Sequence, residues 1–108
     1  MIFKNYKNLH KYNNMQKVFF LADSFDNQIV TRNSMKLFLD KLSRAFSKEI
    51  VLDFKDISFI SRSCADEYIK WKVITSKNKI TEVNMNDDVR MMFKLVSLQY
   101  KRNNILTA

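Results

Sequence analysis

Short apolar runs alternate along the chain with longer segments in which apolar residues recur every three or four positions. The runs 18–22 (VFFLA), 49–54 (EIVLDF) and 80–85 (ITEVNM) have the length and composition of β-strands. The unbroken IVL within the second run predicts a strand that is covered on both faces. We also expect residues 28–30 to form the second arm of a hairpin with the first strand. Residues 57–60 (ISFI) are a second short apolar piece before the next helix.

The segments that follow these strands have the apolar spacing of three helices. Thr31 is suited to cap the first helix, and Asn86 to cap the last one. In chain order, the apolar positions of the three helices are Met35, Phe38, Leu39, Leu42 and Phe46; Ala65, Tyr68, Ile69 and Val73; and Val89, Met92, Phe93 and Val96. The regular alternation of strand and helix predicts an α/β layer fold, with a mostly parallel or mixed central sheet packed against about three helices.

The composition narrows the chemistry that the chain can perform. With no Gly and no Pro among 108 residues, turns that need a positive φ angle must use Asn or Asp. The lack of Gly also excludes a P-loop, a dinucleotide-binding turn and a nucleophile elbow. One Cys and one His cannot form a disulfide within the chain or a Cys/His zinc site. We therefore expect no cofactor and no metal, and we expect Cys64 to be a small core residue.

The same sequence favours a cytoplasmic protein. A single Cys fits a reducing compartment, and no apolar run approaches the roughly 20 residues of a membrane span. The first residues lack the apolar stretch of a secretory signal. We divide the chain into a basic N-terminal arm or extra helix (1–17), a folded domain (18–100) and a polar C-terminal tail (101–108).

The formal net charge of +8 attracts anionic partners. In the N-terminal arm, lysines interleave with aromatic residues, a combination typical of single-stranded nucleic-acid binding. The candidate nucleic-acid contacts are Lys4, Tyr6, Lys7, Lys11, Tyr12 and Lys17. A nucleic-acid-binding accessory protein is therefore one hypothesis for the function.

Another hypothesis comes from residues 51–69, VLDFKDISFISRSCADEYI. The stretch has an apolar strand ending in Asp-Phe, a Phe-Ile pair, Ser-x-Ser, and Ala-Asp-Glu at the opening of a helix. It resembles the STAS-like family of unknown function, which is related to the STAS domains of anti-sigma-factor antagonists. The similarity covers about residues 18–98. The resemblance implies a small STAS-like layer fold. It also implies a non-enzymatic protein-interaction module in a regulatory, partner-switching-like pathway. The partner would be a kinase-like ATPase or another regulator, and we expect no small-molecule ligand.

STAS domains of the antagonist kind carry Asp-Ser-Ser/Thr-Gly at this loop, where a partner kinase phosphorylates a Ser. On that pattern, Ser61 stands at the Asp, Arg62 at the first Ser, Ser63 at the second and Cys64 at the Gly. The first hydroxyl position is thus lost, although the binding surface can remain. The resemblance implies a phospho-acceptor or partner-contact loop made of Ser61, Arg62, Ser63, Asp66 and Glu67.

Each residue of this loop also has a structural interpretation. Ser63 can act as the helix N-cap, with Asp66 in a capping-box-like position, instead of accepting a phosphate. Arg62 can bind an acidic group of a partner or pair with Asp66 or Glu67. The carboxylates, with those of Asp53 and Asp56, suit loop capping and solvated charge better than acid/base catalysis, so we predict no enzymatic activity.

Overall fold

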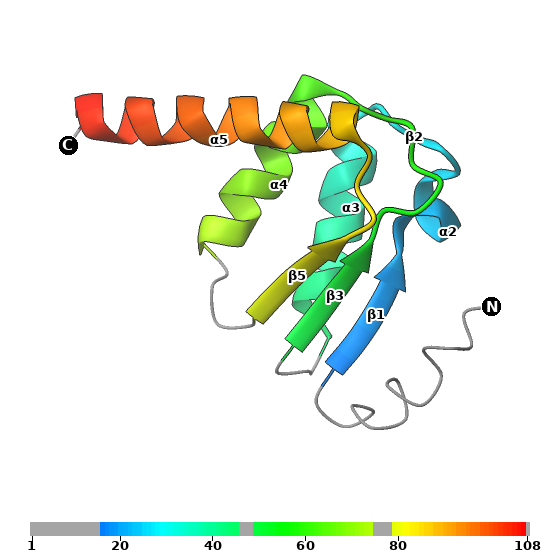
Figure 1. The fold of residues 1–108 in the computed structure, drawn as a ribbon. Coiled ribbons are helices and arrows are strands. Elements are labelled where there is room, and N and C mark those ends of the chain that lie inside the picture. The colour runs from blue at the N-terminus through cyan, green and yellow to red at the C-terminus, as the bar shows by residue number, and fades with distance from the viewer. Residues whose placement is uncertain (1–15, 46–48, 75–78, 108) are drawn as a thin grey trace.

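Three parallel strands form the main sheet of the computed structural model, which describes residues 16–45, 49–74 and 79–107. The strands are β1 (Gln16–Phe20), β3 (Glu49–Asp53) and β5 (Lys79–Val83), with β3 in the centre. The helices α3 (Arg32–Ser43) and α4 (Arg62–Ile74) lie behind the sheet, and α5 (Asp87–Thr107) crosses near the carboxyl ends of the strands (Figure 1). The predicted α/β layer fold is confirmed.

The sheet buries one face. Ile50 and Leu52 point toward the helices and are fully buried, whereas Val51 between them is half-buried on the opposite face. In the part of the chain that the structure describes, no helix covers that opposite face (Figure 1). The prediction of a strand covered on both faces is therefore wrong. Val51 lies in register with Val18 and Thr81, and such β-branched neighbours favour each other on a half-exposed sheet surface.

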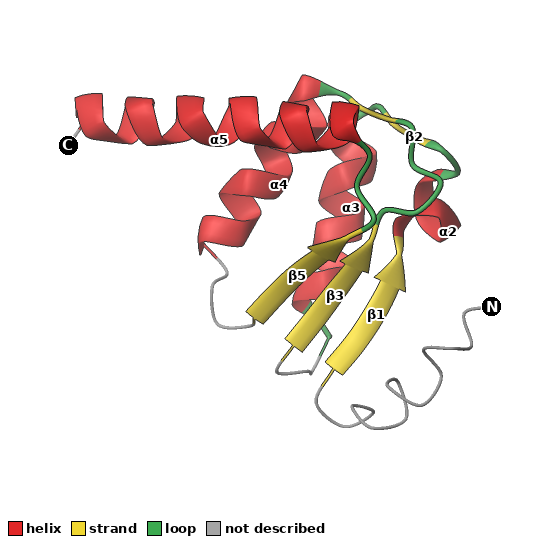
Figure 2. Cartoon of the chain, in the orientation of Figure 1, coloured by secondary structure: helices red, strands yellow, loops and turns green. Residues whose placement is uncertain are grey.

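A second, two-stranded sheet replaces the expected hairpin. β2 (Gln28–Ile29) pairs in parallel with β4 (Phe59–Ile60), not with β1. A short helix that the sequence analysis missed, α2 (Leu21–Phe25), separates β1 from β2; Figure 2 shows it as the small red helix at the end of β1. Tertiary packing holds this helix, because Leu21 is buried and Phe25 packs edge-on against Phe38 with ring centroids 5.2 Å apart.

The predicted apolar stripes form the core in most positions. Met35, Phe38, Leu39 and Leu42 of α3 are buried, as are Ala65 and Tyr68 of α4, and Val89, Phe93 and Val96 of α5. Cys64 is also fully buried, which confirms it as a core residue. Ile69 and Met92 are partly buried against this cluster. Phe46 lies outside the described residues.

Val73 does not belong to the core, and 51% of its surface is exposed. The buried face of α4 runs through Cys64, Ala65 and Tyr68. It continues to Trp71, whose ring lies 6.0 Å from that of Tyr68. Val73 is therefore turned away from the core, at the edge of the helix.

Turns without glycine use the residues that we predicted. The described residues with positive φ are Asp26 (58°), Asp56 (68°) and Asn84 (62°). Asp and Asn tolerate this conformation because their short polar side chains make local hydrogen bonds. The caps also form as predicted: Thr31 Oγ1 accepts a hydrogen bond from the Ser34 amide (3.2 Å), and Asn86 Oδ1 accepts one from the Val89 amide (2.8 Å).

The two ends of the described chain differ from the expected domain limits. Gln16 and Lys17, assigned to the arm, belong to β1. α5 continues beyond Tyr100 to Thr107, where we expected a polar tail, because Lys101 and Arg102 are good helix formers. Its last turns project past α4 (Figure 1). Among the described residues, no helix has both the length and the apolar content that a membrane crossing requires.

Candidate functional site

Ser61 caps α4 and ties it to β2. The residue follows β4 directly, so its backbone leaves a strand and enters a helix, as an N-cap requires. Its hydroxyl accepts a hydrogen bond from the Cys64 amide (3.2 Å) and donates one to the carbonyl oxygen of Val30 (2.8 Å). The prediction that Ser63 is the cap is wrong. Ser63 lies inside the first turn, with its Oγ 3.2 Å from that of Ser61.

The carboxylates of α4 pair with α3, not with Arg62. Arg32, the first residue of α3, donates a hydrogen bond to Glu67, and its Nη1 lies 3.7 Å from Asp66 Oδ2. The hydrogen bond to Glu67 is the largest cause that raises the pKa of Arg32 above its ordinary value. Asp66 also pairs with Lys70 on its own helix, at 3.1 Å. These contacts join the N-terminal ends of the two helices.

Arg62 has a different partner from those that we predicted. Its guanidinium is exposed and donates a hydrogen bond to Gln99 Oε1 of α5. Local spacing on α4 suggested Asp66 or Glu67, but it gave no sign that Arg32 would occupy them from another helix. The sequence holds no pattern for such a contact between helices.

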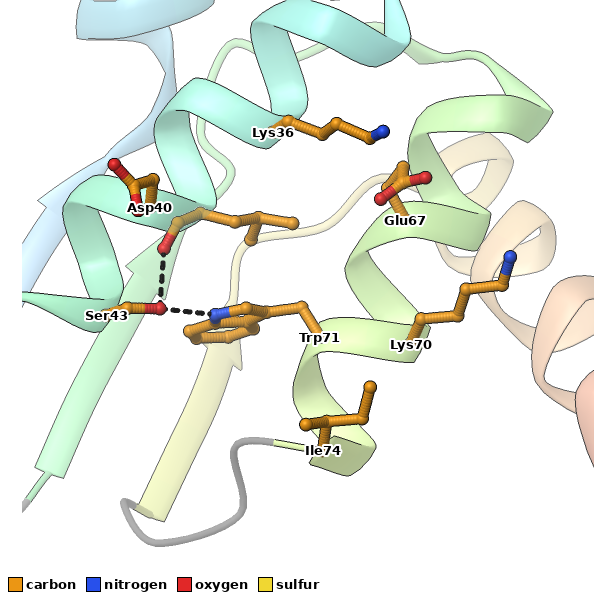
Figure 3. A pocket seen from close by; sticks show the side chains of 8 residues that line it. Lys36, Asp40, Ser43, Glu67, Lys70, Trp71 and Ile74 are labelled. Carbon is orange, nitrogen blue, oxygen red and sulfur yellow. Dashed lines mark hydrogen bonds between the residues drawn. The ribbon is translucent and has the colours of Figure 1, made fainter.

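A groove of about 380 Å³ lies between α3 and α4. Figure 3 shows its lining, which is Lys36, Leu39, Asp40, Ser43, Glu67, Lys70, Trp71 and Ile74. The indole of Trp71 is held in place by a hydrogen bond from its Nε1 to Ser43 Oγ (2.8 Å), and that hydroxyl in turn donates to the Leu39 carbonyl (3.0 Å). Ile74, at the end of α4, is 79% exposed.

The groove and the predicted loop form one continuous surface, because Glu67 belongs to both. We call this the α3–α4 surface: residues 61–67 together with the groove residues. Cations and carboxylates alternate around an apolar strip made of Trp71 and Ile74 (Figure 3). Sequence analysis missed the groove. The available signal was Ile74, an apolar residue of α4 outside the helical stripe.

The remaining candidate carboxylates have structural tasks. Asp53 Oδ1 accepts hydrogen bonds from the Lys55 amide (2.9 Å) and from the Asn84 side chain (3.0 Å), which fixes the ends of β3 and β5. Asp56 occupies one of the positive-φ turns. Within the described ranges, no three His, Cys, Asp or Glu side chains gather as a metal site would require.

Tyr68 is a titratable residue buried in the core of the domain. Its hydroxyl donates a hydrogen bond to Glu82 of β5, and Lys72 Nζ lies 2.7 Å from the same carboxylate oxygen. Burial raises the pKa of Tyr68 strongly, and the negative charge of Glu82 adds to this shift. The trio links α4 to the sheet from beneath the α3–α4 surface.

The nucleic-acid candidates are seen only in part. Lys4, Tyr6, Lys7, Lys11 and Tyr12 lie outside the described residues. Lys17 is exposed on β1. The hypothesis for the arm therefore stays a prediction.

The described chain is thus an α/β layer domain whose candidate site is an open surface between two helices. A scan against protein-family models found no match, and neither did searches of curated proteins and of solved structures. The inference of function depends on the fold, on this surface and on the sequence pattern at residues 51–69.

Proposed function

We propose that this chain is a non-enzymatic, STAS-like protein-interaction module that binds its partner through the α3–α4 surface. The observation that carries the proposal is the exposed Ile74 beside an indole held by Ser43, at the end of a groove that is continuous with residues 61–67. Rigid aromatic side chains next to exposed aliphatic ones are frequent anchors in protein interfaces. The mixed charges of the rim supply orientation.

The STAS-like sequence pattern at residues 51–69 supports a role in a partner-switching pathway. We place the module in cytoplasmic partner switching, with a kinase-like ATPase or another regulator as the bound protein. Cys64 is a free thiol, which fits a reducing compartment. Because the hydroxyl of Ser61 is already used twice, we infer that binding at this loop depends on shape and charge more than on a phosphate at Ser61.

An affinity pull-down from native lysate, at low and high salt, tests this proposal. The bait proteins are the wild type, Ile74→Gln, and Leu37→Gln as matched control. Leu37 is 65% exposed on α3 and does not line the groove. We expect one protein to be enriched by the wild type and by the control in high salt, and to be lost with Ile74→Gln.

Two results would contradict the proposal. Equal capture by Ile74→Gln and the wild type would remove the groove from the interface. A failure of any bait to enrich a protein would argue against an interaction module altogether. Circular dichroism of each variant checks that the fold is retained.

The net charge of +8 supports an alternative function, a nucleic-acid-binding accessory protein that uses residues 1–17. Phosphate neutralisation releases counterions, so affinity for a fluorescent single-stranded oligonucleotide should fall steeply with salt. Deletion of residues 1–14 should remove that binding and leave the pull-down unchanged. Binding that ignores salt would eliminate this alternative.

A further inference from the structure

α5 has two apolar faces. Val89, Phe93 and Val96 are buried, with 0%, 7% and 2% of their surfaces exposed. A second set, Met91, Leu95 and Leu98, has 66%, 48% and 54% exposed. With about 3.6 residues per turn, the second set lies on the side of the helix opposite the first. We call Met91, Leu95 and Leu98 the outer row.

The width of the outer row indicates what it can contact. Its spacing of i, i+4 and i+7 confines the three side chains to a strip of roughly 60° around the helix. That is the narrow seam of helix-to-helix packing, where apolar residues recur every 3.5 positions on average. Helices that lie in a membrane surface typically carry aromatic residues on their apolar face, and the outer row has none. The outer row therefore suits a partner helix better than a lipid surface.

The charge beside the outer row is one-sided. After Asp88, α5 contains Arg90, Lys94, Lys101 and Arg102 and no acidic residue. By their helical spacing, Arg90, Lys94 and Lys101 follow one flank of the row. Arg90 pairs with Asp87 at 3.0 Å, but none of the described carboxylates pairs with Lys94, Lys101 or Arg102. Lys94 and Lys101 on this flank are therefore cations available to a partner.

We propose that the outer row of α5 binds an amphipathic helix of another protein, with aliphatic residues in its seam and acidic residues beside it. Burial of the row removes three apolar side chains from water, and the acidic residues meet the cationic flank. A second copy of this chain fits less well, because it would bring the same cations to the contact. The proposal depends on α5 alone and not on the α3–α4 surface.

Fluorescence anisotropy with a synthetic probe tests the proposal on the full chain. The probe is a labelled peptide about three heptads long, with Leu at positions a and d and Glu at e and g. We expect saturable binding to the wild type, and an affinity at least about 10-fold lower for Leu95→Gln/Leu98→Gln. Both substitutions put an amide where the complex would bury an apolar side chain. Leu37→Gln, at an exposed leucine of α3, should bind as the wild type does.

The charge of the partner is tested separately. In Lys94→Glu/Lys101→Glu, the acidic probe should bind more weakly, and a matched probe with Lys in place of Glu should bind more tightly. The reversal Lys41→Glu/Lys79→Glu changes the net charge equally at sites on α3 and β5 and is the control. A scrambled acidic probe without the heptad spacing should not bind.

Several results would overturn the proposal. Equal binding of the acidic, basic and scrambled probes would show that binding is not specific for an acidic amphipathic helix. Unchanged binding by Leu95→Gln/Leu98→Gln would show that the outer row does not contact the probe. Flotation with phosphatidylserine vesicles that is lost in this variant, without probe binding, would assign the row to membranes. Dimerisation in analytical ultracentrifugation that is lost in the same variant would assign it to a second copy. Ile74→Gln should leave probe binding unchanged, which separates this test from that of the α3–α4 surface.

Discussion

The hydroxyl of Ser61 makes two contacts that Ser63 does not share, so Ser61→Ala and Ser63→Ala should differ in stability. Ser61→Ala removes the N-cap of α4, which costs about 1 kcal/mol of the free energy of unfolding. It also leaves the Val30 carbonyl without its side-chain donor, a loss of about 1 kcal/mol. We therefore expect a total loss of about 2 kcal/mol. Ser63 has Ser61 Oγ as its hydroxyl contact, so Ser63→Ala should cost at most about 0.5 kcal/mol.

Urea unfolding followed by circular dichroism measures both losses. The slope of the transition should be unchanged, because neither substitution alters the surface exposed on unfolding. Ser61→Asp supplies a third measurement. An Asp can cap the helix but cannot donate to Val30, so it should recover about half of the loss. If Ser63→Ala is as destabilising as Ser61→Ala, the assignment of the cap is wrong, and with it our inference that binding at this loop depends on shape and charge more than on a phosphate at Ser61.

Three further measurements test other parts of the fold. Because burial holds the pKa of Tyr68 above its ordinary value of 10.0, its stabilising contribution is complete below pH 10 and is lost as pH rises further. Urea unfolding measures this loss. Between pH 9 and pH 11, the free energy of unfolding of the wild type should fall by about 1.4 kcal/mol more than that of Tyr68→Phe, and equal decreases would contradict this. Asp56→Gly should preserve or raise the melting temperature and Asp56→Val should lower it, since φ is 68° there; the reverse order would refute the turn geometry. Leu52→Ala should cost about 2–5 kcal/mol in urea unfolding and Val51→Ala about 1 kcal/mol or less, whereas similar costs would indicate a sheet covered on both faces.

Periodicity predicted the long elements well, because each buries one face against a common core. The apolar spacing of α3 and the run in β3 appear in the structure within a few residues of the expected limits. Turn chemistry was predictable for a similar reason. In a chain without glycine, only Asp and Asn adopt positive φ at low cost, and Asp26, Asp56 and Asn84 do so.

Contacts between distant segments could not be read from the sequence. The helix α2 forms where the apolar run of β1 continues, because tertiary packing decides where the strand stops. The pairing of β2 with β4 depends on the same packing. Arg32 meets Glu67 across two helices, and no spacing rule within one helix announces that pair.

The sequence predicted a partner-contact loop at residues 61–67, which stays a prediction, and the structure adds the groove beside it. Trp71 packs partly buried against the core, and its hydrogen bond to Ser43 holds the indole in the lining of the groove. The outer row of α5 was hidden for a simpler reason. A helix with apolar residues on two faces has no single apolar stripe, and the sequence pattern predicted only the face that is buried.

The parallel sheet also affects how the chain acquires its fold during synthesis. Gln16 of β1 and Glu49 of β3 face each other although 33 residues separate them, and β5 joins the other side of β3 later still. Because neighbouring strands of this sheet are parallel, no tight turn joins them, and each pairing must first close a long loop. During synthesis on the ribosome, β1 therefore cannot pair with β3 along its whole length until Asp53 has emerged from the exit tunnel. Until then, Phe19 and Phe20 have no neighbouring strand. Slowing translation between these two points would prolong the interval in which the first strand is open to wrong partners.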